Sequence, residues 1–239
     1  MDDLLRDLLG AFVAEVDGAP PNFSVSVRDQ PADARMPRPV HTLHRGTRTV
    51  ARSRNPGRIV RALLRHLDSV AHPPGAGLLA VRAVPLVAGD RAVLAPGKMG
   101  TDLAAAQPHL RRAGLRLADV PHATVDPERG ELVVPDVRLD LRPSGLRRLE
   151  ELDRSADDDP PVPPGRYPLV AWAFVAGEPI GEMPARRGRL WAYPTVVDAP
   201  GVETTLSLLD RVLERTAAVS VPSGVPAQVR HLAGFARPS

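Results

Sequence analysis

Gly97, Lys98, Gly100 and Thr101 lie in the stretch APGKMGTDLAAA, between a hydrophobic run and a helix-like run. A glycine loop between a strand and a helix can bind phosphate oxygens through backbone N–H groups, and a lysine beside it reaches the outer phosphates. The spacing of the nucleotide-binding motif, G-x-x-x-x-G-K-[ST], is absent from this stretch. The sequence therefore predicts either a shortened phosphate loop or a loop that has lost phosphate binding.

Two side chains in the loop favour the second interpretation. Lys98 is the only lysine among the 239 residues, but it comes early in the loop instead of at the start of the following helix. An ordinary exposed loop lysine explains Lys98 equally well. Asp102 lies where a nucleotide loop carries its Ser or Thr, and a carboxylate there stabilises the helix but repels a triphosphate.

The elements that position this loop are predicted from hydrophobic periodicity and from Gly and Pro punctuation. The predicted strands are 23–27, 40–44, 47–51, 78–87, 92–95, 115–117, 123–125, 132–141, 167–176, 188–193 and 218–221. The predicted helices are 1–16, 55–70, 102–113, 144–153 and 203–216, with a last helical turn or two in VPAQVRHLAGF. We expect Pro108 to kink or end its helix. These elements predict an α/β fold.

The overall composition is that of a globular protein, with 43 % hydrophobic and 25 % charged residues. The absence of cysteine excludes disulfides, thiolate metal sites and cysteine nucleophiles. No apolar run approaches the roughly 20 residues of a membrane span, and the amphipathic start MDDLLRDLLGAFVAEV is unlike a secretory signal. We therefore expect a cytoplasmic protein that does not bind membranes.

The basic residues are dominated by arginine, and they are densest between Arg45 and Arg65. This Arg45–Arg65 cluster predicts a solvated basic face or a surface for phosphate or acidic peptide. No aromatic residues alternate with these arginines for base stacking, so we do not expect nucleic-acid binding. His41, His44 and His66 lack the spacing of metal ligands, so no metal site is predicted.

Four stretches resemble the HPr kinase/phosphorylase-like family, whose core is a P-loop fold related to phosphoenolpyruvate carboxykinase. The region before the loop resembles that family's strand–turn–strand: LLAVRAVPLVAGDRAVLAPG. The region after it resembles the following helix and acidic strand end: DLAAAQPHLRRAGLRLADV. Two flanking regions resemble small actinobacterial-type members: HTLHRGTRTVARSRNPGRIVRALLRHL and PVPPGRYPLVAWAFV. The resemblance covers residues 23–235 and implies a mixed central sheet of the HPr kinase C-terminal-domain type with a small N-terminal α/β layer.

The departures from this family fall on its catalytic parts. Only KMGTD separates Gly97 from Leu103, whereas the family's loop is longer and ends in Gly-Lys-Ser/Thr. By the resemblance, Arg82 replaces a histidine in the strand before the loop, and Asp119 is what remains of paired acids after the helix. Arg82 can alternatively be paired with an acid at the sheet edge, and Asp119 can simply end a strand. The chain therefore looks like a degenerate member.

The resemblance also divides the chain into segments. We expect an N-terminal α/β layer in 1–72, a degenerate kinase-like core in 73–154, and an acidic, Pro-rich linker in 155–165. Residues 166–239 are then expected to complete the core with further strands and helices.

The sequence and the resemblance together favour a pseudokinase without a cofactor. By the resemblance, it would bind a peptide or protein as an accessory subunit in the modification of a ribosomally made peptide, the partner being the precursor peptide or a modifying enzyme. One alternative is an ATP-dependent kinase for a peptide Ser or Thr, with Lys98 and Gly100 in a shortened cradle, Asp119 on Mg²⁺ and Arg82 stabilising the transferred charge. Another is a phosphate or anion sensor that uses the loop without chemistry.

Overall fold

The computed structural model divides the chain into two compact units. The smaller unit comprises Met1–His72 and Val137–Asp158, and the larger comprises Pro73–Asp136 and Asp159–Ser239. The structure describes residues 2–10, 22–27, 40–97, 99, 103–154, 162–177 and 179–236. Within this part of the chain, the structure has no helix whose length and apolar character would suit a membrane span.

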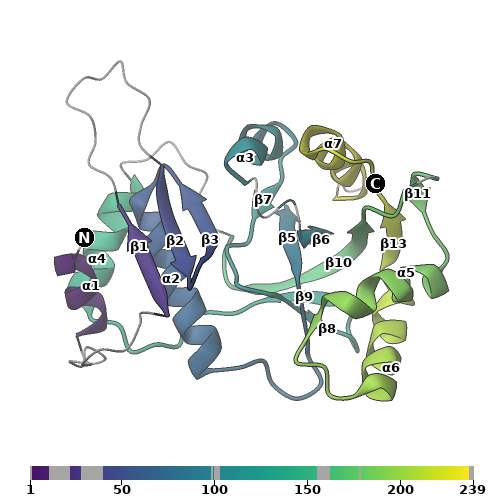
Figure 1. The fold of residues 1–239 in the computed structure, drawn as a ribbon, viewed down its shortest axis with the longest axis horizontal. Helices are drawn as coiled ribbons and strands as arrows, with labels where there is room; N and C mark the ends of the chain where they lie inside the picture. Colours follow the sequence, from purple (N-terminus) through teal and green to yellow (C-terminus); the bar gives the residue numbers. More distant parts are fainter. Residues whose placement is uncertain are drawn as a thin grey trace. The chain divides into compact units, whose positions relative to one another are not determined.

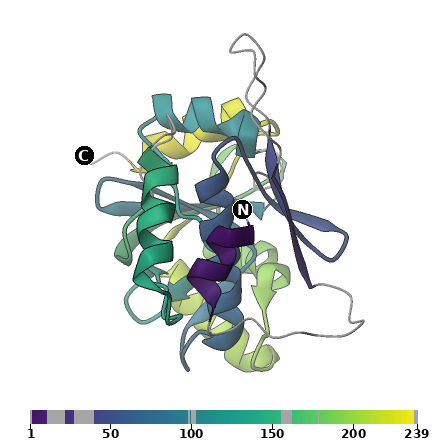
Figure 2. The same ribbon diagram turned by 90° about the vertical axis from the view of Figure 1, so that its left-hand side faces the viewer.

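The smaller unit combines a three-stranded antiparallel sheet with three helices. Its elements are α1 (Asp2–Leu9), β1 (Phe23–Ser26), β2 (His41–Arg45), β3 (Arg48–Ser53), α2 (Pro56–Ala71) and α4 (Pro143–Arg154). The sheet order is β1-β2-β3, and the strands predicted for 40–44 and 47–51 pair as an antiparallel hairpin with Gly46 in the turn. The three helices lie side by side (Figure 2), where Leu8 of α1, Val60 of α2 and Leu149 of α4 form a common core.

Helix α2 begins where the sequence predicts it. The Oδ1 atom of Asn55 accepts a hydrogen bond from the N–H of Gly57 at 2.8 Å, which caps the first turn. Pro56 occupies the first helical position, where its missing N–H costs no helical hydrogen bond. The apolar face of α2 then packs against the sheet through Ile59 and Leu63.

The larger unit contains the remaining elements (Figure 1). Its strands are β4 (Leu79–Val81), β5 (Ala83–Ala88), β6 (Arg91–Pro96), β7 (Arg116–Leu117), β8 (Ala123–Asp126), β9 (Glu131–Val134), β10 (Gly165–Phe174), β11 (Gly181–Glu182), β12 (Val196–Val197) and β13 (Ala217–Ser220). Its helices are α3 (Leu103–Arg112), α5 (Ala185–Ala192), the 3₁₀ turn Tyr193–Thr195, α6 (Val202–Leu213) and α7 (Val225–Ala236).

These strands form one ten-stranded mixed sheet, in which β10 is the central strand. The first half of β10 pairs antiparallel with β9, and its second half pairs parallel with both β6 and β13. Because β6 and β13 both pair with Ala171 and Trp172, they lie on opposite edges of β10. The predicted mixed α/β architecture is thus confirmed.

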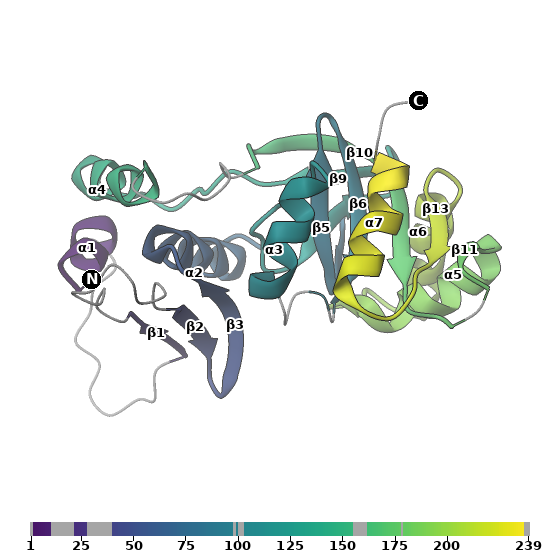
Figure 3. The ribbon, with the colours of Figure 1, turned by 90° about the horizontal axis from the view of Figure 1, so that it is seen from above.

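Helices cover both faces of the sheet around β6 and β10. Alternate residues of a strand point to opposite faces, and β6 follows this rule. Ala92 and Leu94 pack with α5 and α6, whereas Val93 and Ala95 pack with α3 and α7. Figure 3 shows α3 and α7 next to each other along the second face. β5 and β6 are therefore apolar and buried on both faces.

The strand predicted for 188–193 is wrong, because most of this segment belongs to helix α5. Gly188 and Ala192 are the two buried residues of this helix, four residues apart. A Cβ on Gly188 would lie only 2.5 Å from the Cβ of Ala218 on β13. The close packing of Gly188 on β13, a strand distant in the sequence, therefore favours the helix. Local β-propensity does not include such a contact.

Three further segments differ at least in part from the predicted pattern. The strand predicted for 132–141 ends at Val134, and residues 137–154 group with residues 1–72, because α4 packs on α1 and α2. The helix α3 continues past Pro108 to Arg112, so Pro108 does not end it. Of the predicted linker 155–165, residues 155–161 lie outside the described residues, and Gly165 already begins β10.

Candidate functional site

The loop singled out by the sequence joins a strand to a helix, as predicted. β6 ends at Pro96 and α3 begins at Leu103. β6 and β7 are both antiparallel to β5, so β6, α3 and β7 form a crossover between parallel strands. Lys98 and residues 100–102, which include Gly100, Thr101 and Asp102, lie outside the described residues.

Gly97 has a structural reason to be glycine. The register places Ala83 opposite Pro96, so Gly97 follows next to Arg82 at the end of the hairpin. A Cβ at residue 97 would lie 2.8 Å from the backbone carbonyl oxygen of Arg82, which is closer than a carbon atom can approach. The close approach of two backbones thus accounts for this glycine without any phosphate.

Arg82 lies between β4 and β5 at the same end of the hairpin. Its backbone N–H donates a hydrogen bond to the carbonyl oxygen of Thr195 at 2.7 Å, and its side chain is exposed. Within the described part of the chain, no carboxylate pairs with its guanidinium. The Arg82 guanidinium can therefore bind an anion at this end of the sheet.

Asp119 reaches the same end of the sheet from β7. The N–H of Ala118 donates to the carbonyl oxygen of Pro85 at 3.0 Å, which extends the β5–β7 pairing toward the start of β5. Asp119 is half-buried and interacts with other groups. The fold thus brings Arg82, Gly97 and Asp119 to one end of adjacent strands, although they are far apart in sequence.

Among the predicted site residues, this end of the sheet carries one carboxylate, that of Asp119, and one guanidinium, that of Arg82. In the ranges that the structure describes, no group of three or more His, Asp and Glu side chains is arranged to hold a metal ion. Arg82 and Asp119 can each contribute to binding a charged group at this end of the sheet. Phosphoryl transfer needs more, namely metal ligands and a phosphate cradle.

The histidines have local structural partners. His44 lies between two threonines, with its Nε2 3.0 Å from Oγ1 of Thr42 and its Nδ1 3.3 Å from Oγ1 of Thr49. His41 is buried on β2, and burial lowers its pKa below the ordinary value of 6.5.

In the Arg45–Arg65 cluster, Arg45 lies over the ring of Phe23, 5.8 Å from its centroid.

The exposed face of helix α5 is a surface that the sequence reasoning missed. Leu190 is 69 % exposed and Trp191 42 % exposed, whereas the other tryptophan, Trp172, is 1 % exposed in the core. Arg186 and Arg187 precede them by one helical turn and are also exposed. We define the α5 face as these four residues. Predicting residues 188–193 as a strand concealed it, since a strand would alternate Leu190 and Trp191 between two faces.

Searches of the chain against protein-family models, curated proteins and solved structures find no match. The fold and the candidate residues therefore define the chain as a mixed α/β protein, with a ten-stranded sheet and a separate three-stranded sheet.

Proposed function

We propose that this chain is a non-catalytic, HPr kinase-like protein that binds a peptide or protein partner through the α5 face. The mixed sheet and the short loop between β6 and α3 agree with a degenerate member of that family. By the same resemblance, the proposed partner is a precursor peptide or an enzyme that modifies a ribosomally made peptide.

The observation that carries this proposal is the exposure of Leu190 and Trp191 beside two arginines. Tryptophan and arginine are the residue types most enriched among binding hot spots, and an aromatic side chain buries a large area in an interface. The opposite side of α5 is held firmly, because Gly188 and Ala192 pack closely on the sheet. A rigid helix presents its face with little loss of conformational entropy on binding.

The surroundings of the loop support a non-catalytic protein. Gly97 is accounted for by its contact with the Arg82 backbone, so it does not argue for a phosphate cradle. Asp119 is one carboxylate where the kinase mechanism requires a base and metal ligands. The loop sequence, with Lys98 early and Asp102 before the helix, opposes a bound triphosphate.

The kinase alternative has one observation in its favour. Arg82, Gly97 and Asp119 lie at the same end of β5, β6 and β7, and Arg82 has no carboxylate partner among the described residues. Under this alternative, ATP and Mg²⁺ bind at this end of β5, β6 and β7. Calorimetric titration with Mg²⁺-ATP separates the two functions, since a pseudokinase of this kind gives no saturable heat.

The test of partner binding uses a displayed library of random peptides selected on the wild-type chain. The enriched peptides should bind with a change in tryptophan fluorescence, which reports Trp191 because Trp172 is buried. Trp191→Ala should weaken binding by about 2 kcal/mol or more, as expected for a hot spot. Val70→Ala is the matched control, because Val70 is 66 % exposed on α2, outside the α5 face.

Two outcomes contradict the proposal. One is that no peptide is enriched, or that the enriched peptides bind Trp191→Ala as tightly as the wild type. The other is saturable Mg²⁺-ATP binding at micromolar concentration, which supports the kinase alternative.

A further inference from the structure

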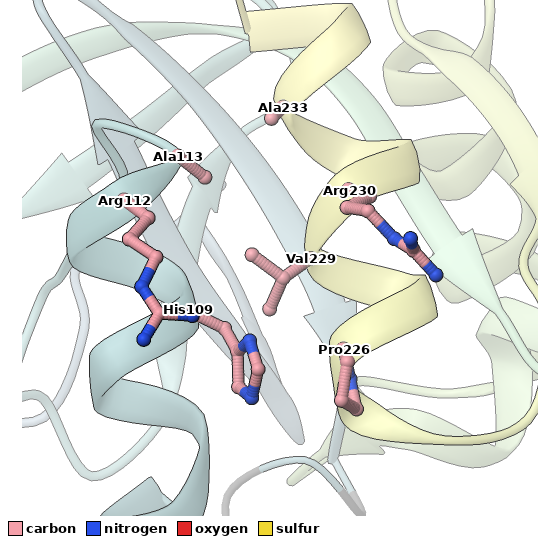
Figure 4. A pocket seen from close by; sticks show the side chains of 7 residues that line it. All are labelled: His109, Arg112, Ala113, Pro226, Val229, Arg230 and Ala233. Carbon is pink, nitrogen blue, oxygen red and sulfur yellow. The ribbon is translucent and has the colours of Figure 1, made fainter.

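A pocket of about 470 Å³ lies between α3 and α7 on the outer side of the larger unit. Its volume is within the range of small-molecule sites, about 300–1,000 Å³. Ala113, Val229 and Ala233 give it an apolar lining, and His109, Arg112 and Arg230 add polar groups (Figure 4). The pocket therefore combines a small apolar surface with basic side chains from two helices.

The pocket exists because of the sheet's topology. β6 and β13 run parallel on either side of β10, so the helices that follow them, α3 and α7, cover the same face. Leu110 of α3 and Leu232 of α7 are buried on the sheet side, whereas the basic residues are on the outer side. The pocket is also distinct from the β6–α3 loop, since His109 and Arg112 belong to the last turn of α3.

The charge of the pocket is not compensated. Among the described residues, no aspartate or glutamate lines it, and neither Arg112 nor Arg230 takes part in an ion pair. Some other arginines of the larger unit have carboxylate partners: Arg166 contacts Asp126 at 2.6 Å, and Arg189 contacts Asp210 at 2.7 Å. At the α3–α7 pocket, two arginines without such a partner lie on neighbouring helices.

Helix stability explains only part of this arrangement. His109 and Arg112 lie in the last turn of α3, where positive charge stabilises the helix dipole. Arg230 lies in the middle of α7, where this effect is small. Figure 4 shows the His109 ring between the helices, the Arg112 guanidinium near it, and the exposed Arg230 side chain extending outward from α7. A different rotamer of this long, exposed side chain would bring its guanidinium over the pocket.

We propose that the α3–α7 pocket binds a small phosphate monoester that carries an apolar group. Two guanidinium groups match the charge of a phosphate dianion and donate paired hydrogen bonds to its oxygens. His109 supplies a further hydrogen-bond donor to the same group. The apolar part of the ligand packs on Val229 and Ala233. This inference is independent of the α5 face and of the loop before α3.

The experiment titrates the full chain with phenyl phosphate, inorganic phosphate and benzoate, using calorimetry and amide chemical shifts. Phenyl phosphate should bind most tightly, because only it combines a dianion with an apolar ring. The shifts should cluster on 109–113 and 226–233. Inorganic phosphate tests the charge without the apolar part, and benzoate tests a carboxylate in place of the phosphate.

Variants of the two exposed arginines identify the site without disturbing the core. Arg112→Gln and Arg230→Gln should each weaken phenyl phosphate binding by about tenfold, since each removes a charge-assisted contact. Arg129→Gln is the matched control, because Arg129 is exposed in the β8–β9 turn and changes the net charge equally. It should leave the affinity unchanged, as should Trp191→Ala.

Any of three results would overturn the inference. The first is that phenyl phosphate does not bind saturably, and the second is that Arg129→Gln weakens binding as much as the pocket variants do. The third is that the amide shifts map to residues 95–99 and not to α3 and α7. If benzoate binds as tightly as phenyl phosphate, the assignment of a phosphate ligand is also wrong.

Discussion

Gly97 and Arg82 touch through their backbones, and a Cβ at residue 97 would come to 2.8 Å from the Arg82 carbonyl oxygen. This contact lies at the open end of the β5–β6 hairpin, where the chain leaves β6 and enters the β6–α3 loop. Gly97, which the sequence pattern predicts as part of a phosphate loop, therefore has a packing role. The two roles predict different consequences of substitution.

Gly97→Ala should lower the free energy of unfolding by about 1–3 kcal/mol, the usual cost of overpacking a site that cannot relax. Gly234→Ala is the matched control within the same unit, because nothing lies within 4 Å of its Cβ position. In the last turn of α7, that change should be neutral or stabilise by up to about 1 kcal/mol. Urea unfolding measures both, and equal stability of the two variants would contradict the packing role.

Asp68 connects the end of α2 to the segment that leads into α4. Its buried carboxylate accepts hydrogen bonds from the backbone N–H of Arg138 at 2.8 Å and from Nδ1 of His72 at 2.9 Å. Asp68→Ala leaves both donors without this acceptor, so it should destabilise the smaller unit by about 1–3 kcal/mol.

Amide hydrogen exchange is the appropriate measurement for Asp68→Ala, because it reports each segment separately. Residues 137–142 and the end of α2 should lose protection, while β5 and β6 keep theirs. Asp140→Ala is the control, since Asp140 is exposed in the same unit. Unchanged protection at Arg138 in Asp68→Ala would show that this hydrogen bond does not hold the segment.

The elements set by local sequence could be predicted. Asn55 and Pro56 specify the start of α2 through a cap and a fixed φ angle, and both act within one turn. The strand–loop–helix order from β6 to α3 follows from the switch of periodicity and the glycine of the loop. In each case the physical cause lies within a few residues of its effect.

The features set by distant contacts could not be predicted. α5 is a helix packed on β13 through Gly188 and Ala218, which are thirty residues apart in the sequence. The α3–α7 pocket depends on β6 and β13 pairing with the same strand, which the sequence pattern does not specify. The basic residues of α3 and α7 therefore gave no signal of a site until the topology placed the helices together.

The pH dependence of the smaller unit should reflect His41. Burial lowers the pKa of His41 below its ordinary value of 6.5, so the unfolded chain binds a proton more readily than the folded chain. Stability from this residue is present above pH 6.5 and is lost as the pH falls from about 6.5 through the folded pKa.

Histidine NMR titration should give His41 the lowered pKa, and urea unfolding of the smaller unit should show decreasing stability below about pH 6.5. His41→Gln removes the titrating group and should flatten this part of the pH profile. His44→Gln is the control, since His44 lies on the same strand but is less buried than His41. A wild-type profile that stays flat down to about pH 5 would contradict the assignment.

The final prediction concerns Lys98, whose side-chain amine is the only one in the protein. If the β6–α3 loop has lost phosphate binding, an amine-specific reagent should modify Lys98 rapidly when the N-terminus is blocked. Neither ATP with Mg²⁺ nor phosphate should slow this reaction, because a single ammonium in solvent, four residues before Asp102 in the sequence, would contribute only about 1 kcal/mol or less to anion binding. Intact mass counts the modification directly, and Lys98→Ala supplies the unmodified reference. A functional phosphate cradle would instead cover the amine, so protection that rises with ATP occupancy would overturn the pseudokinase proposal in favour of the kinase.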